Sequence, residues 1–513
     1  MAAETDTLDD RIGFRSIQVK GTDILLNGKP LWMRGICIHE EAPTREGRAY
    51  SAEDSATLLG WAKELNCNFV RLAHYPHNEY MTRMADELGL LVWSEIPLYW
   101  MIAWEDPAVK KNATQQLTEM IARDKNKASI ILWSVANETA ISEERTAFLG
   151  GMAELARSLD STRLITAALL VKPKNGVANL DDPLGEYLDV LGCNEYFGWY
   201  GKRDPELFKT VWKSPYNKPL VMSETGAGAL QGLRGNVDTR WTEDFQADVY
   251  RQQFPMLDEI SFLRGVTPWL LRDFLSPRRF LPRYQDWYNR KGLISERGEK
   301  KQAFQLLQEY YERKARQTEG TRWEPVELLQ NPAVEVLGNP EVEDGALFFD
   351  GKDDALILDE NPLEGLSAFT VEVLMRPDAG GAEAQRFFHI GEVDGDRMLL
   401  ETRVTEDGHW VLDTYLQSGD SSCVLIDRSK QHPLGEWAHV ALVLENGTMK
   451  HYVNGQMECK GDLDFQPINS GHTSIGVRLN KVHWYKGALD SIRITPQALN
   501  PEAFSLRCCS NPE

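Results

Sequence analysis

The sequence predicts an α/β (β/α)8 TIM barrel followed by an all-β, jelly-roll-like sandwich. Three observations lead to this prediction. From residue 30 to about residue 315, short apolar runs alternate with amphipathic segments of helical period, which is typical of a parallel sheet with crossover helices. After residue 343 the helical period disappears, and short alternating strands follow one another between turn signals. The chain of 513 residues is also too long for one ordinary domain.

Eight apolar runs are the candidate barrel strands. Helical segments such as residues 52–65 and 78–89 lie between them, and the second ends at Gly89, as a helix C-cap should. Eight strand–helix units within roughly 280 residues match the size of a TIM barrel. An open, doubly wound sheet is the alternative, but eight units fit closure better. The candidate strands are residues 30–38, 68–74, 90–96, 129–135, 163–169, 188–194, 219–224 and 264–271.

The domain boundaries follow from the change in pattern. We expect the barrel at residues 1–317, a linker at 318–342, which is polar and contains prolines, and the sandwich at 343–513. Within the sandwich, the Asn-Gly pairs at 446–447 and 454–455 are strong signals for β-hairpins.

Composition excludes several classes of partner. The formal net charge of −21, from 77 acidic and 56 basic residues, repels phosphate backbones, so no nucleic-acid partner is expected. No stretch has the length and apolarity of a membrane span. The start, MAAETDTLDDR, lacks an apolar signal-peptide core, which favours the cytoplasm unless a leader was removed before secretion or export to the periplasm. The sequence leaves a homo-oligomer open.

The cysteines indicate neither a metal site nor a disulfide framework. They are odd in number and lack the spacing of a zinc site. No His-x-His or comparable set of ligands follows a strand, which disfavours a metal-dependent hydrolase. The seven cysteines are Cys37, Cys67, Cys193, Cys423, Cys459, Cys508 and Cys509.

Two glutamates follow predicted barrel strands directly. The fourth strand runs into Ala136-Asn137-Glu138, and the seventh ends at Glu224. Catalytic groups of TIM barrels lie at the carboxyl ends of the strands, so both side chains are expected in one pocket mouth. A pair of carboxyl groups cleaves a glycosidic bond, one as proton donor and the other as nucleophile or base. A rim salt bridge or a helix cap is the alternative for each glutamate taken alone.

Five segments around these glutamates resemble the catalytic barrel of glycoside hydrolase family 2. The resemblance covers about residues 12–315, and the family includes β-galactosidases, β-glucuronidases and β-mannosidases. It implies a retaining mechanism, in which Glu224 is the nucleophile and Glu138 the general acid/base, with no cofactor required. The segments are RGICIHEE (34–41), VRLAHYPH (70–77), WSVANE (133–138), NEYFGWY (194–200) and MSETGA (222–227).

The resemblance also implies roles for residues that contact the sugar. Asn137 would bind the sugar 2-hydroxyl, and Tyr196 would support Glu224. His39 and Trp269 would line the sugar subsite, and Arg71 would lie beside the nucleophile as part of the substrate-binding set. Taken alone, His39 could equally be a hydrogen-bonded rim histidine, and Trp269 a core residue.

Residues 272–291 bear on the identity of the sugar. This segment has six basic and two acidic residues, although the chain as a whole is acidic, and cations near the substrate favour an anionic sugar. Asn289 and Lys291 resemble the Asn-x-Lys motif by which β-glucuronidases bind the uronic acid carboxylate. We therefore expect an exo-acting β-glucuronidase, with β-galactosidase as the alternative. A carbohydrate-binding protein with a degenerate barrel is the alternative from another class, although both glutamates are present.

The family resemblance does not extend to the whole chain. Family 2 enzymes usually begin with a jelly-roll domain and an immunoglobulin-like domain, whereas this chain starts almost at the barrel. Residues 343–505 resemble a laminin-G or concanavalin-like module, which binds carbohydrate or packs as a structural companion. Asp350, Asp353 and Asp354 could hold a structural calcium ion. An exposed acidic turn is the alternative, which we favour.

Overall fold

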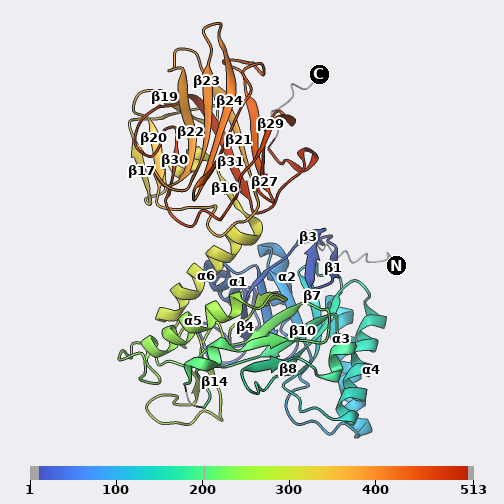
Figure 1. Ribbon diagram of the computed structural model, residues 1–513. Helices are drawn as coiled ribbons and strands as arrows, with labels where there is room; N and C mark the ends of the chain where they lie inside the picture. Colours follow the sequence, from blue (N-terminus) through green and yellow to red (C-terminus); the bar gives the residue numbers. More distant parts are fainter. Residues whose placement is uncertain (1–10, 202, 507–513) are drawn as a thin grey trace, which may run out of the picture. The chain divides into compact units, whose positions relative to one another are not determined.

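The computed structural model describes residues 11–201 and 203–506, and the chain forms two compact units (Figure 1). The first unit is Met1–Lys314 and the second is Ala315–Glu513. Each unit has its own hydrophobic core. Residues 1–10, on which the signal-peptide expectation depends, lie outside the described residues, as do Cys508 and Cys509.

The first unit is a closed barrel of eight parallel strands, which confirms the predicted fold. Each predicted strand corresponds to one barrel strand. Neighbouring barrel strands follow one another in sequence, and the last pairs with the first. The barrel strands are β4 (Met33–His39), β5 (Phe69–Ala73), β6 (Leu91–Glu95), β7 (Ile130–Asn137), β8 (Leu164–Leu170), β10 (Val190–Asn194), β12 (Leu220–Glu224) and β13 (Leu263–Val266).

Helices cover the outside of the barrel, and their ends follow local sequence signals (Figure 1). Helix α1 begins after Ser51, whose hydroxyl accepts a hydrogen bond from the Asp54 N–H, as an N-cap does. Helix α2 ends at Gly89 in the left-handed conformation, as predicted. The helices of this unit are α1 (Ala52–Glu64), α2 (Glu79–Leu88), α3 (Pro107–Asp124), α4 (Glu143–Leu159), α5 (Glu243–Asp258) and α6 (Gln302–Glu319).

The crossovers on either side of β10 contain short elements in place of long helices. The first contains β9 (Val177–Asn179) and the 3-10 helix η1 (Pro183–Glu186). The second contains the 3-10 helix η2 (Pro205–Lys209) and β11 (Val211–Lys213), and β9 pairs with β11.

A small sheet that the sequence did not predict closes the amino-terminal end of the barrel. It consists of β1 (Ile17–Lys20), β2 (Asp23–Leu26) and β3 (Lys29–Pro30). Ile17 and Ile24 from this sheet form one buried cluster with residues near the starts of barrel strands, such as Met33, Phe69 and Val190. The opposite end, where the strands finish, remains available for a site.

The second unit is a sandwich of two antiparallel sheets, which confirms the predicted all-β class. Its core lies between the sheets and contains side chains such as Trp410, Phe388 and Val440. One sheet has the order β18-β19-β31-β21-β27-β28-β29, with β16 beside β31. The other has the order β17-β20-β30-β22-β23-β24-β25, with β26 beside β24.

The secondary structure of the second unit consists almost entirely of strands. Its strands are β16 (Thr321–Trp323), β17 (Val334–Leu337), β18 (Glu341–Glu343), β19 (Ala346–Asp350), β20 (Ala355–Leu358), β21 (Phe369–Pro377), β22 (Ala384–Gly391), β23 (Arg397–Val404), β24 (His409–Ser418), β25 (Ser421–Ile426), β26 (His432–Pro433), β27 (Ala438–Glu445), β28 (Thr448–Val453), β29 (Gln456–Asp462), β30 (His472–Ile475) and β31 (Lys486–Thr495). A short helix α7 (Pro325–Leu328) and the 3-10 helix η3 (Pro501–Ala503) accompany them.

Both predicted Asn-Gly turns connect antiparallel strands. Asn446-Gly447 joins β27 to β28, and Asn454-Gly455 joins β28 to β29. All four residues have positive φ, between 48° and 77°, as two-residue hairpin turns of type I′ require.

The prediction of a linker at residues 318–342 is wrong. This segment contains β16, α7, β17 and β18, and its strands pair with β31, β20 and β19. Trp323 and Leu328 are buried in the core of the second unit. The segment is therefore part of the sandwich.

The described residues contain neither a candidate membrane-spanning helix nor a disulfide bond. None of their helices combines the length and the apolarity that crossing a bilayer would take. Their five cysteines are free thiols: Cys37, Cys67, Cys193 and Cys423 are buried, and Cys459 is half-buried.

Candidate active site

A pocket of about 880 Å³ lies at the carboxyl ends of the barrel strands. Both predicted catalytic glutamates line it, and six of the seven other predicted site residues do so too. Its polar and aromatic walls come from the ends of β4, β7, β10 and β12 and from the loops after β5, β6 and β13. The lining residues are His39, His74, Tyr99, Trp100, Met101, Asn137, Glu138, Tyr196, Tyr200, Glu224, Trp269, Phe274, Ser276, Pro277, Arg278, Arg279, Asn289 and Lys291.

Glu224, the last residue of β12, is held by two hydrogen bonds. Arg71 donates from Nη1 to Oε1 at 3.0 Å, and the Tyr196 hydroxyl donates to Oε2 at 2.5 Å. Burial raises the pKa of Glu224, Arg71 opposes that rise, and the charge of Glu138 adds to it. A buried carboxylate fixed at both oxygens is suited to act as a nucleophile, because its orientation is set before the substrate binds.

Arg71 lies behind the pocket wall, which corrects its place in the substrate-binding set. Its side chain is completely buried and is absent from the pocket lining. It forms an ion pair with Glu95, at 3.1 Å from Nη2 to Oε1, and donates to the Asn137 side chain at 2.7 Å. Arg71 therefore positions Glu224 and Asn137 from behind the pocket wall. Burial raises the pKa of Glu95, but the charge of Arg71 together with the hydrogen bonds from His74 and Trp93 outweighs this, so the net shift in the pKa is downward.

Glu138 follows β7 directly, and its backbone has the unusual φ of +51°. Its N–H donates to the Ala168 carbonyl in β8 at 2.9 Å, which fixes this turn. The Asn194 amide donates to Oε1 at 3.0 Å, and the Trp100 indole donates to Oε2 at 2.9 Å. Both carboxylate oxygens therefore have a donor, and the group faces the pocket from the strand end.

Asn137 and Asn194 connect the surroundings of the two glutamates. The Asn194 amide nitrogen also donates to the Asn137 side-chain oxygen at 3.1 Å. That same oxygen accepts the bond from Arg71, and Arg71 bonds Glu224. A continuous network therefore runs from Glu138 to Glu224. With its oxygen occupied in this way, the Asn137 amide group is left to donate to a ligand in the pocket.

His39 and Trp269 form part of the wall, and each stacks on a neighbour. The His39 ring lies 4.0 Å from the Phe274 ring with an interplanar angle of 10°. Burial, followed by the nearby charges of His77, His74 and Arg48, lowers the pKa of His39 to about 3, so its imidazole is neutral near pH 7. Trp269 stacks on His74 at 4.8 Å.

Lys291 is a buried ammonium group at the pocket wall. Its Nζ donates to the Tyr200 hydroxyl at 2.9 Å and lies over the rings of Tyr196 and Tyr200, 4.9 and 5.0 Å from their centres. Burial lowers the pKa of Lys291, although Tyr200 opposes the shift. Among the described residues, no carboxylate forms a salt bridge with Lys291. Asn289 lies beside it, and its side-chain oxygen accepts the Lys291 backbone N–H at 3.3 Å.

The cations of the basic segment 272–291 fall into two groups: some form salt bridges within the protein, and others line the pocket. Arg272 pairs with Glu41 at 3.2 Å, and Arg290 pairs with Glu296, so these two charges are compensated. Arg278, Arg279 and Lys291 line the pocket instead. The segment begins and ends in a small antiparallel pair, β14 (Phe274–Leu275) with β15 (Tyr288–Asn289).

Several residues of the site were not singled out from the sequence. His74 donates from Nδ1 to the Glu95 carboxylate at 2.8 Å, and its Nε2 lies 3.7 Å from Oε1 of Glu224. Asn194 and Tyr200 belong to the motif that pointed to Tyr196, so their positions in it were the available signal. Trp100 lies in the loop after β6, outside the motifs quoted from the sequence, and it is 44% exposed.

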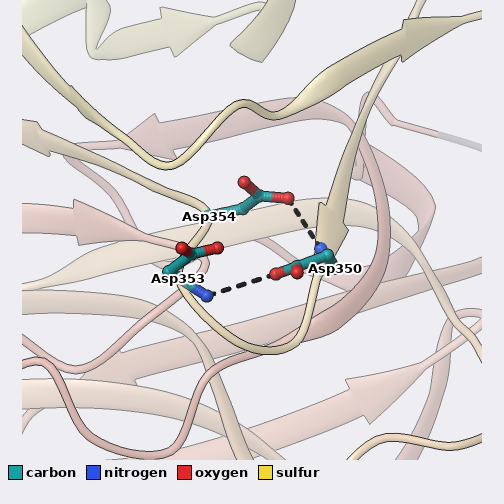
Figure 2. Close-up of side chains that lie close together, drawn as sticks. All are labelled: Asp350, Asp353 and Asp354. Atoms are coloured by element: carbon teal, nitrogen blue, oxygen red, sulfur yellow. Dashed lines mark hydrogen bonds between the residues drawn. The ribbon is translucent and has the colours of Figure 1, made fainter.

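The second unit contains the acidic turn between β19 and β20. Asp350, Asp353 and Asp354 each offer a carboxylate oxygen, and these three atoms lie within 4.8 Å of one another (Figure 2). Asp350 accepts the backbone N–H groups of Lys352 and Asp353, and Asp354 accepts those of Asn339 and Asp350. These bonds hold the turn by themselves, so the cluster does not by itself indicate a metal site.

Comparisons with known proteins find relatives of the barrel. Residues 17–256 match the family described as glycosyl hydrolases family 2, TIM barrel domain. A β-glucuronidase from Streptococcus agalactiae is 31% identical over 327 aligned residues, and the match covers 58% of this chain and 53% of the relative. A GH2 β-galacturonidase structure from Eisenbergiella tayi, bound to galacturonate, has a TM-score of 0.53 and 29% identity over 59% of this chain and 55% of that one.

A third relative is the structure of a β-glucuronidase from Ruminococcus gnavus in complex with D-glucuronic acid. It has a TM-score of 0.52 and 26% identity, and the match covers 59% of this chain and 53% of that one.

The matches cover only part of each protein. The chain spans about half the length of the curated relatives it matches, between 48% and 53%. Its residues 350–503 match a different group, the concanavalin A-like lectin/glucanases superfamily. Residues 17–256 of the chain therefore resemble the TIM barrel domain of glycosyl hydrolase family 2, and residues 350–503 resemble a domain of the concanavalin A-like superfamily.

Proposed function

We propose that this chain is a retaining exo-β-glycosidase that hydrolyses terminal β-linked uronic acids, with β-glucuronides as the first candidate substrates. The observation that carries the proposal is the composition of one pocket. Two glutamates of the kind that retaining glycosidases use face it together with Lys291, a buried cation whose described surroundings include no paired carboxylate. A carboxylate of the sugar would supply the missing anion.

In the proposed reaction, Glu224 attacks the anomeric carbon while Glu138 protonates the leaving oxygen. Arg71 and Tyr196 hold Glu224 through both its oxygens, so the attacking group is oriented before the sugar arrives. Water then hydrolyses the glycosyl-enzyme, with Glu138 acting as base. Asn137 is placed to donate to the sugar 2-hydroxyl, a contact that strengthens in the transition state. No cofactor is needed, because the two carboxyl groups supply both the nucleophile and the proton.

The uronic acid assignment has support from the similar structures. One contains glucuronic acid and the other galacturonate. Both sugars have a carboxylate at C6 and differ from each other only in the configuration at C4. An epimer at C4 leaves the charge at Lys291 unchanged, so we keep β-galacturonides as the second candidate. A neutral galactoside would leave the buried ammonium group without a counter-ion, which costs binding free energy.

Hydrolysis of three p-nitrophenyl glycosides tests the proposal. We expect the β-glucuronide or the β-galacturonide to be cleaved at least about a hundredfold faster, in kcat/KM, than the β-galactoside, the magnitude of one lost charge-assisted contact. Glu224→Gln should abolish turnover, and Lys291→Ala should lower kcat/KM for the uronide by a similar factor. Lys209→Ala, at an exposed lysine paired with Glu206 outside the pocket, is the matched control and should retain activity.

Two results would contradict the proposal. Faster cleavage of the galactoside would reject the role of Lys291 and restore the β-galactosidase alternative. Sugar binding without cleavage of any of the three glycosides would support the carbohydrate-binding alternative with a degenerate barrel.

A further inference from the structure

The loop after β6 places an exposed indole against the general acid. The backbone N–H of Trp100 donates to the Asn137 carbonyl at 3.1 Å, and the backbone N–H of Asn137 donates to the Leu98 carbonyl at 2.9 Å. These two bonds attach the loop to the end of β7. From there the Trp100 indole bonds Oε2 of Glu138. Tyr99, Trp100 and Met101 have exposed fractions of 38%, 44% and 96% while lining the pocket.

An unpaired arginine lies on this indole. The guanidinium carbon of Arg278 is 4.9 Å from the centre of the Trp100 ring, and Arg278 is exposed and lines the pocket. Within the described part of the chain, no carboxylate pairs with Arg278. A guanidinium stacked on an aromatic face keeps its N–H groups free in its own plane, where they can bind a carboxylate or sulfate through two bonds.

The position of this pair relative to Glu138 tells which part of a substrate it would meet. A general acid gives its proton to the oxygen of the leaving group, so the groups around its outer oxygen border the leaving group. Oε1 of Glu138 faces Asn194, toward Asn137 and the nucleophile, whereas Oε2 faces Trp100. Trp100 and Arg278 therefore lie on the leaving-group side of Glu138.

We propose that the leaving group is itself an anionic sugar, whose carboxylate or sulfate Arg278 binds while its ring lies on Trp100. The proposal rests on the proposed function and narrows the substrate class to acidic saccharides, in which a terminal uronic acid is linked to a second charged unit. In this arrangement Lys291 binds the sugar that is released, and Arg278 binds the unit that remains.

Three disaccharides with the same linkage test this inference. Each has the β-linked uronic acid that is cleaved faster as its p-nitrophenyl glycoside, here linked to O4 of a second unit, which is glucose, glucuronic acid or glucose 6-sulfate. Because the leaving oxygen is the same, differences in kcat/KM report on the charge of the leaving sugar. We expect one or both charged disaccharides to be cleaved at least about tenfold better than the neutral one. Which of the two is preferred identifies the anion.

Variants assign the preference to Arg278. Arg278→Ala should reduce the charged-to-neutral ratio of kcat/KM to within about threefold of unity, and Arg278→Lys should leave an intermediate ratio, because lysine keeps the charge without the planar pair of donors. Arg283→Ala, in the same loop but outside the pocket lining, should keep the wild-type ratio.

The outcomes separate this inference from the proposed function. Equal cleavage of the three disaccharides, or an unchanged ratio in Arg278→Ala, would overturn the inference while the β-uronidase assignment stands. Failure to cleave any β-uronide, including the p-nitrophenyl compounds, would reject both.

Discussion

Glu224 shows how opposing effects at single residues set the pH range of the proposed reaction. Burial raises its pKa, while Arg71 and the Tyr196 hydroxyl lower it by stabilising the charged form. A nucleophile must be deprotonated, so kcat/KM is expected to fall as the pH drops through this pKa. The acid limb of the pH–rate profile therefore reports on the groups around Glu224.

Tyr196→Phe should move that acid limb to higher pH. The variant removes a hydrogen bond that favours the carboxylate, so the pKa of Glu224 rises further and a larger fraction of the nucleophile is protonated at a given pH. A rise of one pH unit would correspond to about 1.4 kcal/mol of lost stabilisation. The measurement is kcat/KM against pH for both proteins on a p-nitrophenyl β-uronide. A lower plateau with an unmoved acid limb would mean that Tyr196 acts on the sugar and not on Glu224.

The residues that could be named from the sequence are those that directly follow a strand or belong to a recognisable motif. Glu138 and Glu224 come immediately after apolar runs, and the barrel rule alone brings them to one end. Arg71 was expected to contact the substrate. Its motif indicates that it lies near the nucleophile, but not that its side chain is buried behind the pocket wall. Trp100 and Arg278 lie in loops, whose paths depend on backbone bonds such as that from Trp100 to Asn137. No periodicity encodes such a path.

At the scale of elements, the loop that carries Arg278 and Lys291 is fastened at both ends to one buried carboxylate. Asp273 accepts bonds from Lys301 Nζ at 2.8 and 2.9 Å and from the Gly292 N–H at 2.8 Å, and it pairs with Arg290 at 3.4 Å. Burial raises the pKa of Asp273 to about 6, with Lys301 opposing the rise. The start of the loop, its end and the start of α6 therefore meet at this group.

Lys301→Met should destabilise the protein by about 3 kcal/mol, because it leaves Asp273 buried with only the more distant Arg290 as a counter-ion. The pKa of Asp273 would rise further, so the carboxyl would carry a proton over a wider pH range. The loss of stability should accordingly be larger at pH 8, where wild-type Asp273 is ionised beside Lys301, than at pH 5, where the carboxyl is protonated in both proteins.

Urea unfolding at the two pH values measures this difference. Lys300→Met is the matched control, because Lys300 pairs with Glu64 at the surface, and its loss should cost less than about 1 kcal/mol. Equal losses at pH 5 and pH 8 would show that Lys301 contributes packing and not charge.

Elements were predictable where burial imposes a pattern. The eight barrel strands are almost entirely buried and read as apolar runs. The small strands β1, β2 and β3 have two to four residues and mixed exposure, which is too short for alternation to be distinguished from a loop. β18 is exposed at all three residues and was missed for the same reason.

At the scale of the whole molecule, the chain divides into a barrel and a sandwich with separate cores, and the sequence placed the second boundary too late. Residues 318–342 appeared to be a linker because the exposed edge strands β17 and β18 leave their polar side chains in solvent. The buried members of this segment are Trp323, Pro325 and Leu328. They are not adjacent in sequence, so they did not form a visible apolar run.

The position of the boundary predicts how fragments of the second unit behave. A fragment of residues 315–513 keeps β16, α7, β17 and β18, whereas one of residues 343–513 loses the pairing of β16 with β31 and of β17 with β20. It also loses the burial of Trp323 and Leu328, which are worth about 1.5–3 kcal/mol each. This is a large share of the 5–15 kcal/mol that stabilises an ordinary domain. The shorter fragment should therefore unfold at a clearly lower temperature, or fail to fold, in a thermal melt followed by circular dichroism. Equal Tm values would mean that these strands are an appendage and that the sandwich is complete without them.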